Sequence, residues 1–107
     1  TLSDALRMGC PMLTCMGDSF GSRMGASLLT ALDMPELITT TQAQYEQLAV
    51  NLAMNPKKLK VLKEKLTSNV RTMPLYDTQQ FTRSLEAAYL VMHDRCQNGE
   101  NVDDIYV

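Results

Sequence analysis

Two short apolar segments, with one helical segment between them, are the only candidate strands in the chain. Residues 11–15 read PMLTC and residues 36–40 read ELITT, and turn-forming residues or prolines bound both. Residues 22–33 between them place apolar side chains at helical spacing, and Pro35 ends that helix. A strand, a helix and a strand with tight connections form a βαβ unit, so we expect the two strands to be parallel.

Two short parallel strands cannot form a complete sheet. A parallel sheet requires cover on both faces and normally has more strands. The sequence offers no third strand, so we expect the rest of the sheet to lie in another part of a longer protein. The start at Thr1, without an initiator methionine, agrees with that expectation.

Local capping signals predict where the other helices begin and end. A short helix follows Thr1–Asp4 and ends at Gly9, and Ser22 is expected to cap the helix over 22–33. The apolar positions predicted on one face of that helix are Met24, Leu28, Leu29 and Leu32.

From residue 41 onward the pattern is wholly helical. Thr41 and Gln44 form a predicted capping box, and Asn55-Pro56 is typical of a cap followed by proline at the first helical position. Asp77 or Thr78 begins a last helix that runs to about Gln97, with Gly99 as its stop. The apolar stripe predicted on this helix consists of Phe81, Leu85, Ala88, Tyr89 and Met92.

Charge and cysteine content exclude several classes of function. The net charge of −2 is spread along the chain, which is not the footprint of a nucleic-acid or anionic-membrane binder. No apolar run is long enough to cross a bilayer, and three cysteines without C-x-x-C spacing argue against a disulfide framework or zinc. We therefore expect a reducing, cytoplasmic setting. Five lysines on the helix after Pro56 favour a solvated face over a basic binding patch: Lys57, Lys58, Lys60, Lys63 and Lys65.

The sequence carries few residues suited to catalysis. His93 is the only histidine, and a surface position on the last helix is the favoured interpretation. Cys10 and Cys15 flank an apolar strand and are expected to be inert. Thr1–Asp4 at a helix start could bind phosphate, and the loop Gly17–Gly21 follows a parallel strand where ligands bind in α/β sheets. From pattern alone, an ordinary cap and an ordinary loop remain the simpler interpretations.

Four stretches in one register resemble the end of the catalytic region of O-GlcNAc transferases and their SPINDLY-like relatives. They cover about residues 1–92 and read SDALRMGCPMLT, GDSFGSRMGASLLTALDMPELI, QYEQLAVNLAMNPKKLKVLKEKL and PLYDTQQFTRSLEAAY. The resemblance implies two facing Rossmann-like domains, usually preceded by tetratricopeptide repeats. It also implies an inverting transfer of N-acetylglucosamine from UDP-GlcNAc to Ser or Thr hydroxyls of proteins, with no metal and no cofactor besides the donor substrate.

The resemblance also assigns residues. Thr1 matches a threonine that contacts the diphosphate, and Asp4 matches an aspartate that contacts the ribose. Arg23 matches an arginine after the glycine-rich loop and is expected to be a structural anchor. That loop begins Met16-Gly17 here, where the family often has Pro-Gly, so its contacts with substrate stay open. No catalytic residue is expected in this chain.

These observations predict an α/β fold, in which the chain is the C-terminal half of a Rossmann-like glycosyltransferase domain. Residues 1–77 would complete the UDP-sugar-binding domain, 78–98 would form the helix that crosses to the N-terminal catalytic domain, and 99–107 would be an acidic, flexible tail. The expected partners are a UDP-sugar, a protein acceptor and the missing N-terminal regions, with no nucleic acid or membrane. Two alternatives stay open: a non-catalytic helical interaction module, or an enzyme that uses another nucleotide sugar such as GDP-fucose.

Overall fold

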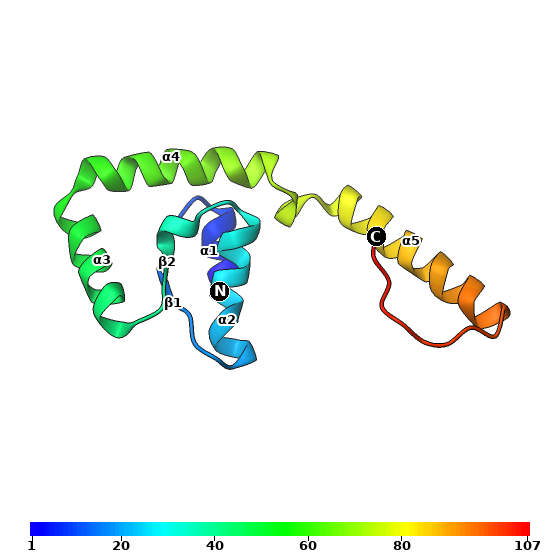
Figure 1. Ribbon diagram of the computed structural model, residues 1–107. Coiled ribbons are helices and arrows are strands. Elements are labelled where there is room, and N and C mark those ends of the chain that lie inside the picture. Colours follow the sequence, from blue (N-terminus) through cyan, green and yellow to red (C-terminus); the bar gives the residue numbers. More distant parts are fainter. The chain divides into compact units, whose positions relative to one another are not determined.

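The computed structural model describes all 107 residues and divides them into two compact units, Thr1–Tyr76 and Asp77–Val107 (Figure 1). The first unit contains every element up to the second 3-10 turn. In chain order these elements are α1 (Leu2–Arg7), β1 (Thr14–Cys15), α2 (Phe20–Ala31), η1 (Pro35–Leu37), β2 (Ile38–Thr39), α3 (Gln42–Met54), α4 (Pro56–Thr72) and η2 (Pro74–Tyr76). The second unit contains α5 (Thr78–Gln97) and the C-terminal tail. The chain is thus mostly helical, with one small sheet.

The two strands pair in parallel, as the strand–helix–strand pattern predicts. Thr14 stands opposite Ile38 and Cys15 opposite Thr39, and the Met16 amide donates to the Thr39 carbonyl at 2.7 Å. The strands are shorter than predicted, since each has two residues. Pro35 fixes φ and begins the 3-10 turn η1, so the chain becomes extended only at Ile38.

Helix α2 begins earlier than predicted, because Ser19 and not Ser22 is its N-cap. The Ser19 hydroxyl accepts from the Ser22 amide at 3.3 Å, and the Ser22 hydroxyl in turn donates to the Ser19 carbonyl at 2.8 Å. Serine is a favoured N-cap residue at either position, so the pattern did not distinguish the two, and the prediction that Ser22 is the cap is wrong. The helix therefore starts at Phe20 and takes Gly21 into its first turn.

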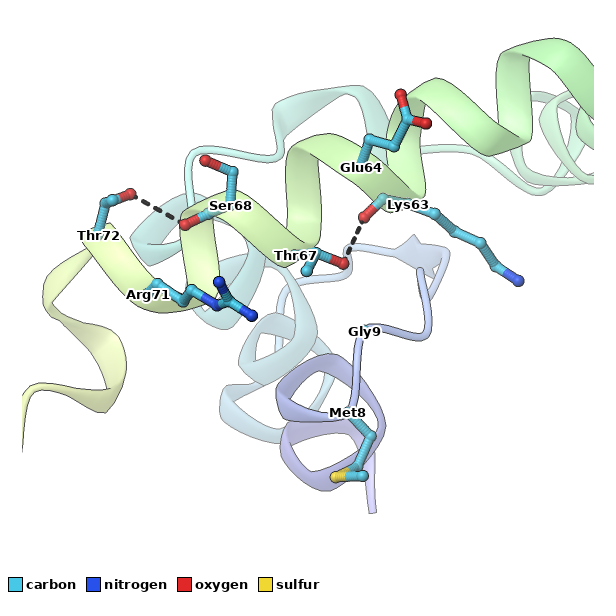
Figure 2. Close-up of a pocket in the computed structure, with 8 residues that line it drawn as sticks. All are labelled: Met8, Gly9, Lys63, Glu64, Thr67, Ser68, Arg71 and Thr72. Atoms are coloured by element: carbon cyan, nitrogen blue, oxygen red, sulfur yellow. Dashed lines mark hydrogen bonds between the residues drawn. The ribbon is translucent and has the colours of Figure 1, made fainter.

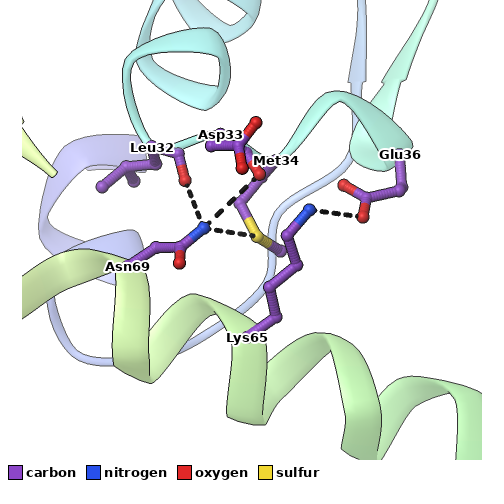
Figure 3. Close-up of polar contacts among 6 residues, drawn as sticks. All are labelled: Leu32, Asp33, Met34, Glu36, Lys65 and Asn69. Carbon is purple, nitrogen blue, oxygen red and sulfur yellow. Dashed lines mark hydrogen bonds and ion pairs between the residues drawn. The ribbon is translucent and has the colours of Figure 1, made fainter. Parts of the chain in front are cut away.

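The C-terminus of α2 is capped by local backbone hydrogen bonds and by the side chain of Asn69, which is distant in the sequence. Asp33 has a φ of 53°, and the amides of Asp33 and Met34 donate to the carbonyls of Thr30 and Leu29, as in a Schellman motif. The buried side chain of Asn69 from α4 then donates to the Leu32 carbonyl at 2.7 Å (Figure 3). This contact joins α4 to the end of α2.

The caps of α3 and α4 largely follow the prediction. The Thr41 hydroxyl accepts from the Gln44 amide at 3.2 Å, but Gln44 Oε1 accepts from the amide of Thr40 and not of Thr41. Asn55 Oδ1 accepts from the Lys58 amide at 3.2 Å, with Pro56 at the first helical position. In Figure 1, the hairpin of α3 and α4 places α4 over α1 and the end of α2.

The core of the first unit is built mainly from leucines of α1, α2, η1, α3 and α4. Its fully buried side chains are Leu6, Leu29, Leu32, Met34, Leu37 and Leu66. Met24, which the helical spacing placed among these, is 45% exposed instead. Only one face of α2 packs against the core. This face is centred on Ala26 and Leu29, and Met24 lies outside it.

Helix α5 extends over the predicted range but buries none of its residues. Asp77 caps it by accepting from the Gln80 amide at 2.9 Å, and Gly99, with a φ of 67°, closes it. Phe81 is 65% exposed and Tyr89 58% exposed, so the predicted apolar stripe faces solvent. The tail has no helix or strand, and Arg95 donates to the carbonyls of its residues Asp103 and Asp104.

No helix in the structure has the length and apolar character that crossing a membrane would require.

Candidate functional site

Helix α1 presents both residues that the resemblance assigns to the nucleotide. Thr1 is at the N-cap position, yet its hydroxyl makes no capping bond to the helix. The Asp4 side chain is 90% exposed. No lysine or arginine pairs with Asp4, so its carboxylate is free to accept from other donors.

Close packing at a glycine holds the first turn of α1 beside β1 and α2. A Cβ placed on Gly25 would lie 2.6 Å from Thr14 Oγ1 and 3.5 Å from a methyl group of Leu2. Only glycine therefore allows α2 to approach β1 and Leu2 this closely. The three elements meet at the side chain of Leu2, the residue that follows Thr1.

The loop after β1 is held by its own hydrogen bonds. Arg23 Nη1 donates to the Gly17 carbonyl at 3.3 Å, and the Gly17 amide donates to the Ser22 carbonyl at 3.4 Å. Arg23 itself is exposed, so its contact with the loop does not bury its charge. Arg23 thus contacts the loop that it was predicted to anchor, and the anchoring role itself stays a prediction. Phe20, the first residue of α2 after this loop, is 84% exposed.

A groove of about 560 Å³ lies at the other end of α1, against α4 (Figure 2). Met8 and Gly9 form one side, and Lys63, Thr67 and Arg71 lie along the facing surface of α4. The Thr67 hydroxyl is used within the helix, where it donates to the Lys63 carbonyl at 2.8 Å. All of the α4 side chains that line the groove are exposed. The groove is therefore an open surface, and it is separate from Thr1 and Asp4.

The lysines of α4 are largely engaged within the protein. Lys65 Nζ lies 2.6 Å from Glu36 Oε1 (Figure 3), and Lys60 pairs with Glu64 at 3.9 Å. Partial burial of Glu36 raises its pKa, but hydrogen bonding and the positive charge of Lys65 outweigh that effect, and the pKa is lowered overall. Ion pairs of this partly exposed kind are typical of a solvated helix face, which is what the sequence indicated.

The remaining candidates for chemistry are the histidine and the three cysteines. His93 is exposed on α5 and contacts only its neighbour Asp94, at 3.4 Å. Cys10 is exposed and Cys15 is half-buried, and all three cysteines are free. The structure assembles no group of three His, Cys, Asp or Glu side chains that could hold a metal ion.

One residue near the site was not identified from the sequence. Tyr76 Oη donates to the Ser3 carbonyl at 2.7 Å and lies 3.3 Å from the Ser3 hydroxyl. The pair is 73 residues apart in the chain, so no local pattern reports it.

Comparison with known proteins agrees with the resemblance found in the sequence. The sequence model of Glycosyl transferase family 41 matches residues 1–85. The chain is 34% identical over 101 residues to the "Probable UDP-N-acetylglucosamine--peptide N-acetylglucosaminyltransferase SPINDLY" of Hordeum vulgare, an alignment that covers 94% of this chain and 11% of that protein.

Two further relatives carry related names. A "Probable UDP-N-acetylglucosamine--peptide N-acetylglucosaminyltransferase SEC" of Arabidopsis thaliana is 34% identical over 93 residues, which is 86% of this chain and 10% of the relative. The "UDP-N-acetylglucosamine--peptide N-acetylglucosaminyltransferase" of Caenorhabditis elegans is 31% identical over 102 residues, which is 95% and 9% of the two proteins. The chain spans about a tenth of the length of the relatives it matches. By the family match over most of its length, this chain belongs to Glycosyl transferase family 41.

Proposed function

We propose that this chain is the C-terminal part of the catalytic region of a protein O-linked N-acetylglucosaminyltransferase. Membership of Glycosyl transferase family 41 carries the proposal, together with relatives that are named as UDP-N-acetylglucosamine–peptide transferases. Because the chain spans about a tenth of those relatives, the groups that perform the transfer would lie in the rest of the protein. The alternatives of an interaction module or a GDP-fucose enzyme have no counterpart in these names.

Within that enzyme, Thr1 and Asp4 would contribute to the UDP-GlcNAc site. Asp4 offers an exposed carboxylate without a cationic side-chain partner, which suits hydrogen bonds from the two ribose hydroxyls. Thr1 offers a hydroxyl that is not used in capping, and it stands at a helix start where backbone amides favour a diphosphate. Arg23 would hold the neighbouring loop in place through the Gly17 carbonyl.

The fold supports the corresponding architectural proposal. A two-stranded parallel sheet with α2 between its strands would be the final part of a larger Rossmann-like sheet. Helix α5, whose apolar side chains are exposed, would cross to the N-terminal catalytic domain and be covered there. Neither element then requires a partner outside the enzyme.

Transfer assays test the proposal. The full-length protein that contains this chain should transfer sugar from UDP-GlcNAc to Ser or Thr of an acceptor protein, and GDP-fucose should not replace that donor. The isolated 107-residue chain should transfer none, since the general base and most of the donor site are absent from it. Transfer by the isolated chain, or a full-length protein that uses only GDP-fucose, would overturn the proposal.

A further inference from the structure

The side chain of Tyr76 makes the only side-chain hydrogen bonds that join α1 to another element. Its hydroxyl donates to the Ser3 carbonyl at 2.7 Å, and the Ser3 hydroxyl lies 3.3 Å away. The Ser3 carbonyl belongs to the peptide unit whose nitrogen is that of Asp4. Tyr76 therefore holds the backbone segment that carries the Asp4 side chain.

Helix α1 depends on such contacts for its orientation. It has six residues, and a helix this short is not stable by itself in water. Leu6 is fully buried in the core and fixes where the helix packs, while Gly9 lies against Thr67 at its C-terminal end. On the side of the first turn, Tyr76 supplies the hydrogen bond to Ser3, and its ring lies 5.8 Å from the guanidinium carbon of Arg7.

We infer that Tyr76 is a positioning residue for the nucleotide site. The inference rests on the proposed function, in which Asp4 accepts from the ribose. The position of a carboxylate on the first turn of a short helix depends on how firmly that turn is fixed. Small displacements of the carboxylate weaken its hydrogen bonds steeply. The shorter of the two contacts that Tyr76 makes is with the Ser3 backbone carbonyl, which is present whatever side chain stands at position 3.

The test compares Tyr76→Phe with Ser3→Ala in the full-length protein. Tyr76→Phe keeps the ring and its contact with Arg7 but removes the hydrogen bond to the Ser3 carbonyl. We expect UDP to bind about three- to tenfold more weakly, the range for losing one hydrogen bond. Ser3→Ala leaves the carbonyl in place and should keep the dissociation constant within about twofold of the unmodified protein.

Further measurements separate positioning from simple support of the fold. For Tyr76→Phe, the KM for UDP-GlcNAc should rise while kcat at saturating donor stays unchanged, and the amides of Ala5 and Met8 should exchange faster. A purely structural role would lower the unfolding temperature and leave the UDP affinity of the folded protein unchanged, which would overturn the inference.

The variant Asp4→Ala, measured in the same way, distinguishes this inference from the proposal beneath it. If Asp4→Ala weakens UDP binding and Tyr76→Phe does not, the inference is wrong and the proposed site stands. If Asp4→Ala leaves UDP binding unchanged, the proposed site is wrong, and the role of Tyr76 is wrong with it.

Discussion

At the scale of single residues, the buried side-chain amide of Asn69 links two helices of the first unit. Its Nδ2 donates to the Leu32 carbonyl at 2.7 Å, lies 3.4 Å from the Asp33 carbonyl and approaches Met34 Sδ at 3.9 Å (Figure 3). These carbonyls stand at the end of α2, where the helix itself supplies no donors. One side chain thus satisfies a helix end and ties it to α4.

Replacing Asn69 by alanine should therefore destabilise the fold. The Leu32 carbonyl would lose its partner in a buried position, which costs about 1–3 kcal/mol in the free energy of unfolding. Asn51→Ala is the matched control, because Asn51 is exposed and accepts only from Lys58 Nζ, and it should cost about 0.5 kcal/mol or less. Equal midpoints of urea unfolding for the two variants would contradict this account of Asn69.

Two glycines of α2 give a second prediction with an internal control. Gly25→Ala would place a methyl group 2.6 Å from Thr14 Oγ1, so either Thr14 or α2 must shift, and we expect a loss of about 1–3 kcal/mol in stability. Gly21→Ala, in the same helix, meets nothing within 4 Å and should stabilise by about 0.5 kcal/mol through helix propensity. Urea unfolding of both variants measures the difference, and stabilisation by Gly25→Ala would refute the close contact.

At the scale of elements, the ion pair between η1 and α4 makes stability depend on pH. The pKa of Glu36 is lowered because Lys65 outweighs the effect of burial. A lowered carboxyl pKa contributes stability that is present above the usual glutamate pKa of about 4.3, and this stability is lost as the pH falls through the lowered value.

Glu36→Gln tests this dependence. Because both side chains are partly exposed, with 32% and 44% of their surface accessible, the pair should contribute about 0.5 kcal/mol or less at neutral pH. The variant should be less stable than the unmodified chain at pH 7 and equally stable near pH 3. Glu64→Gln removes the more exposed pair with Lys60 and should show a smaller change. A difference that grows toward low pH would contradict the assigned sign.

The helices could be predicted from the sequence more fully than the sheet. Caps such as Asn55-Pro56 and Asp77 are local, because donor and acceptor lie within one turn, and the structure forms them as expected. The strand lengths depend on pairing between distant segments, and the extended backbone proved to be limited to two residues in each. The prediction that Ser22 caps α2 was also wrong. Both Ser19 and Ser22 can cap a helix, and the path of the loop determines which of them lies at the helix start.

The site shows the same division. The sequence indicated that Thr1 and Asp4 lie at a helix start, but it favoured an ordinary cap, whereas the Thr1 hydroxyl makes no capping bond in the structure. Tyr76 and Asn69 could not be predicted, because their partners are 73 and 37 residues away, and only the folded chain brings them together.

At the scale of the whole molecule, the chain has one well-packed unit and one helix with an uncovered apolar face. The leucine core belongs entirely to Thr1–Tyr76, and no residue of α5 is buried. A family member that is about ten times longer provides ample chain to cover that helix. The chain is thus one part of a longer family 41 protein, and the proposal that this part binds the donor nucleotide can be tested directly.

The affinity of the full-length protein for UDP, with and without Asp4→Ala, tests that view most directly. By isothermal titration calorimetry, the variant should bind UDP about 10- to 100-fold more weakly, as expected when a charge-assisted hydrogen bond is lost. Its unfolding temperature should not change, because Asp4 is 90% exposed. Glu46→Ala, an exposed acid on α3, should leave both values unaltered. An Asp4→Ala variant with undiminished UDP affinity would contradict the account.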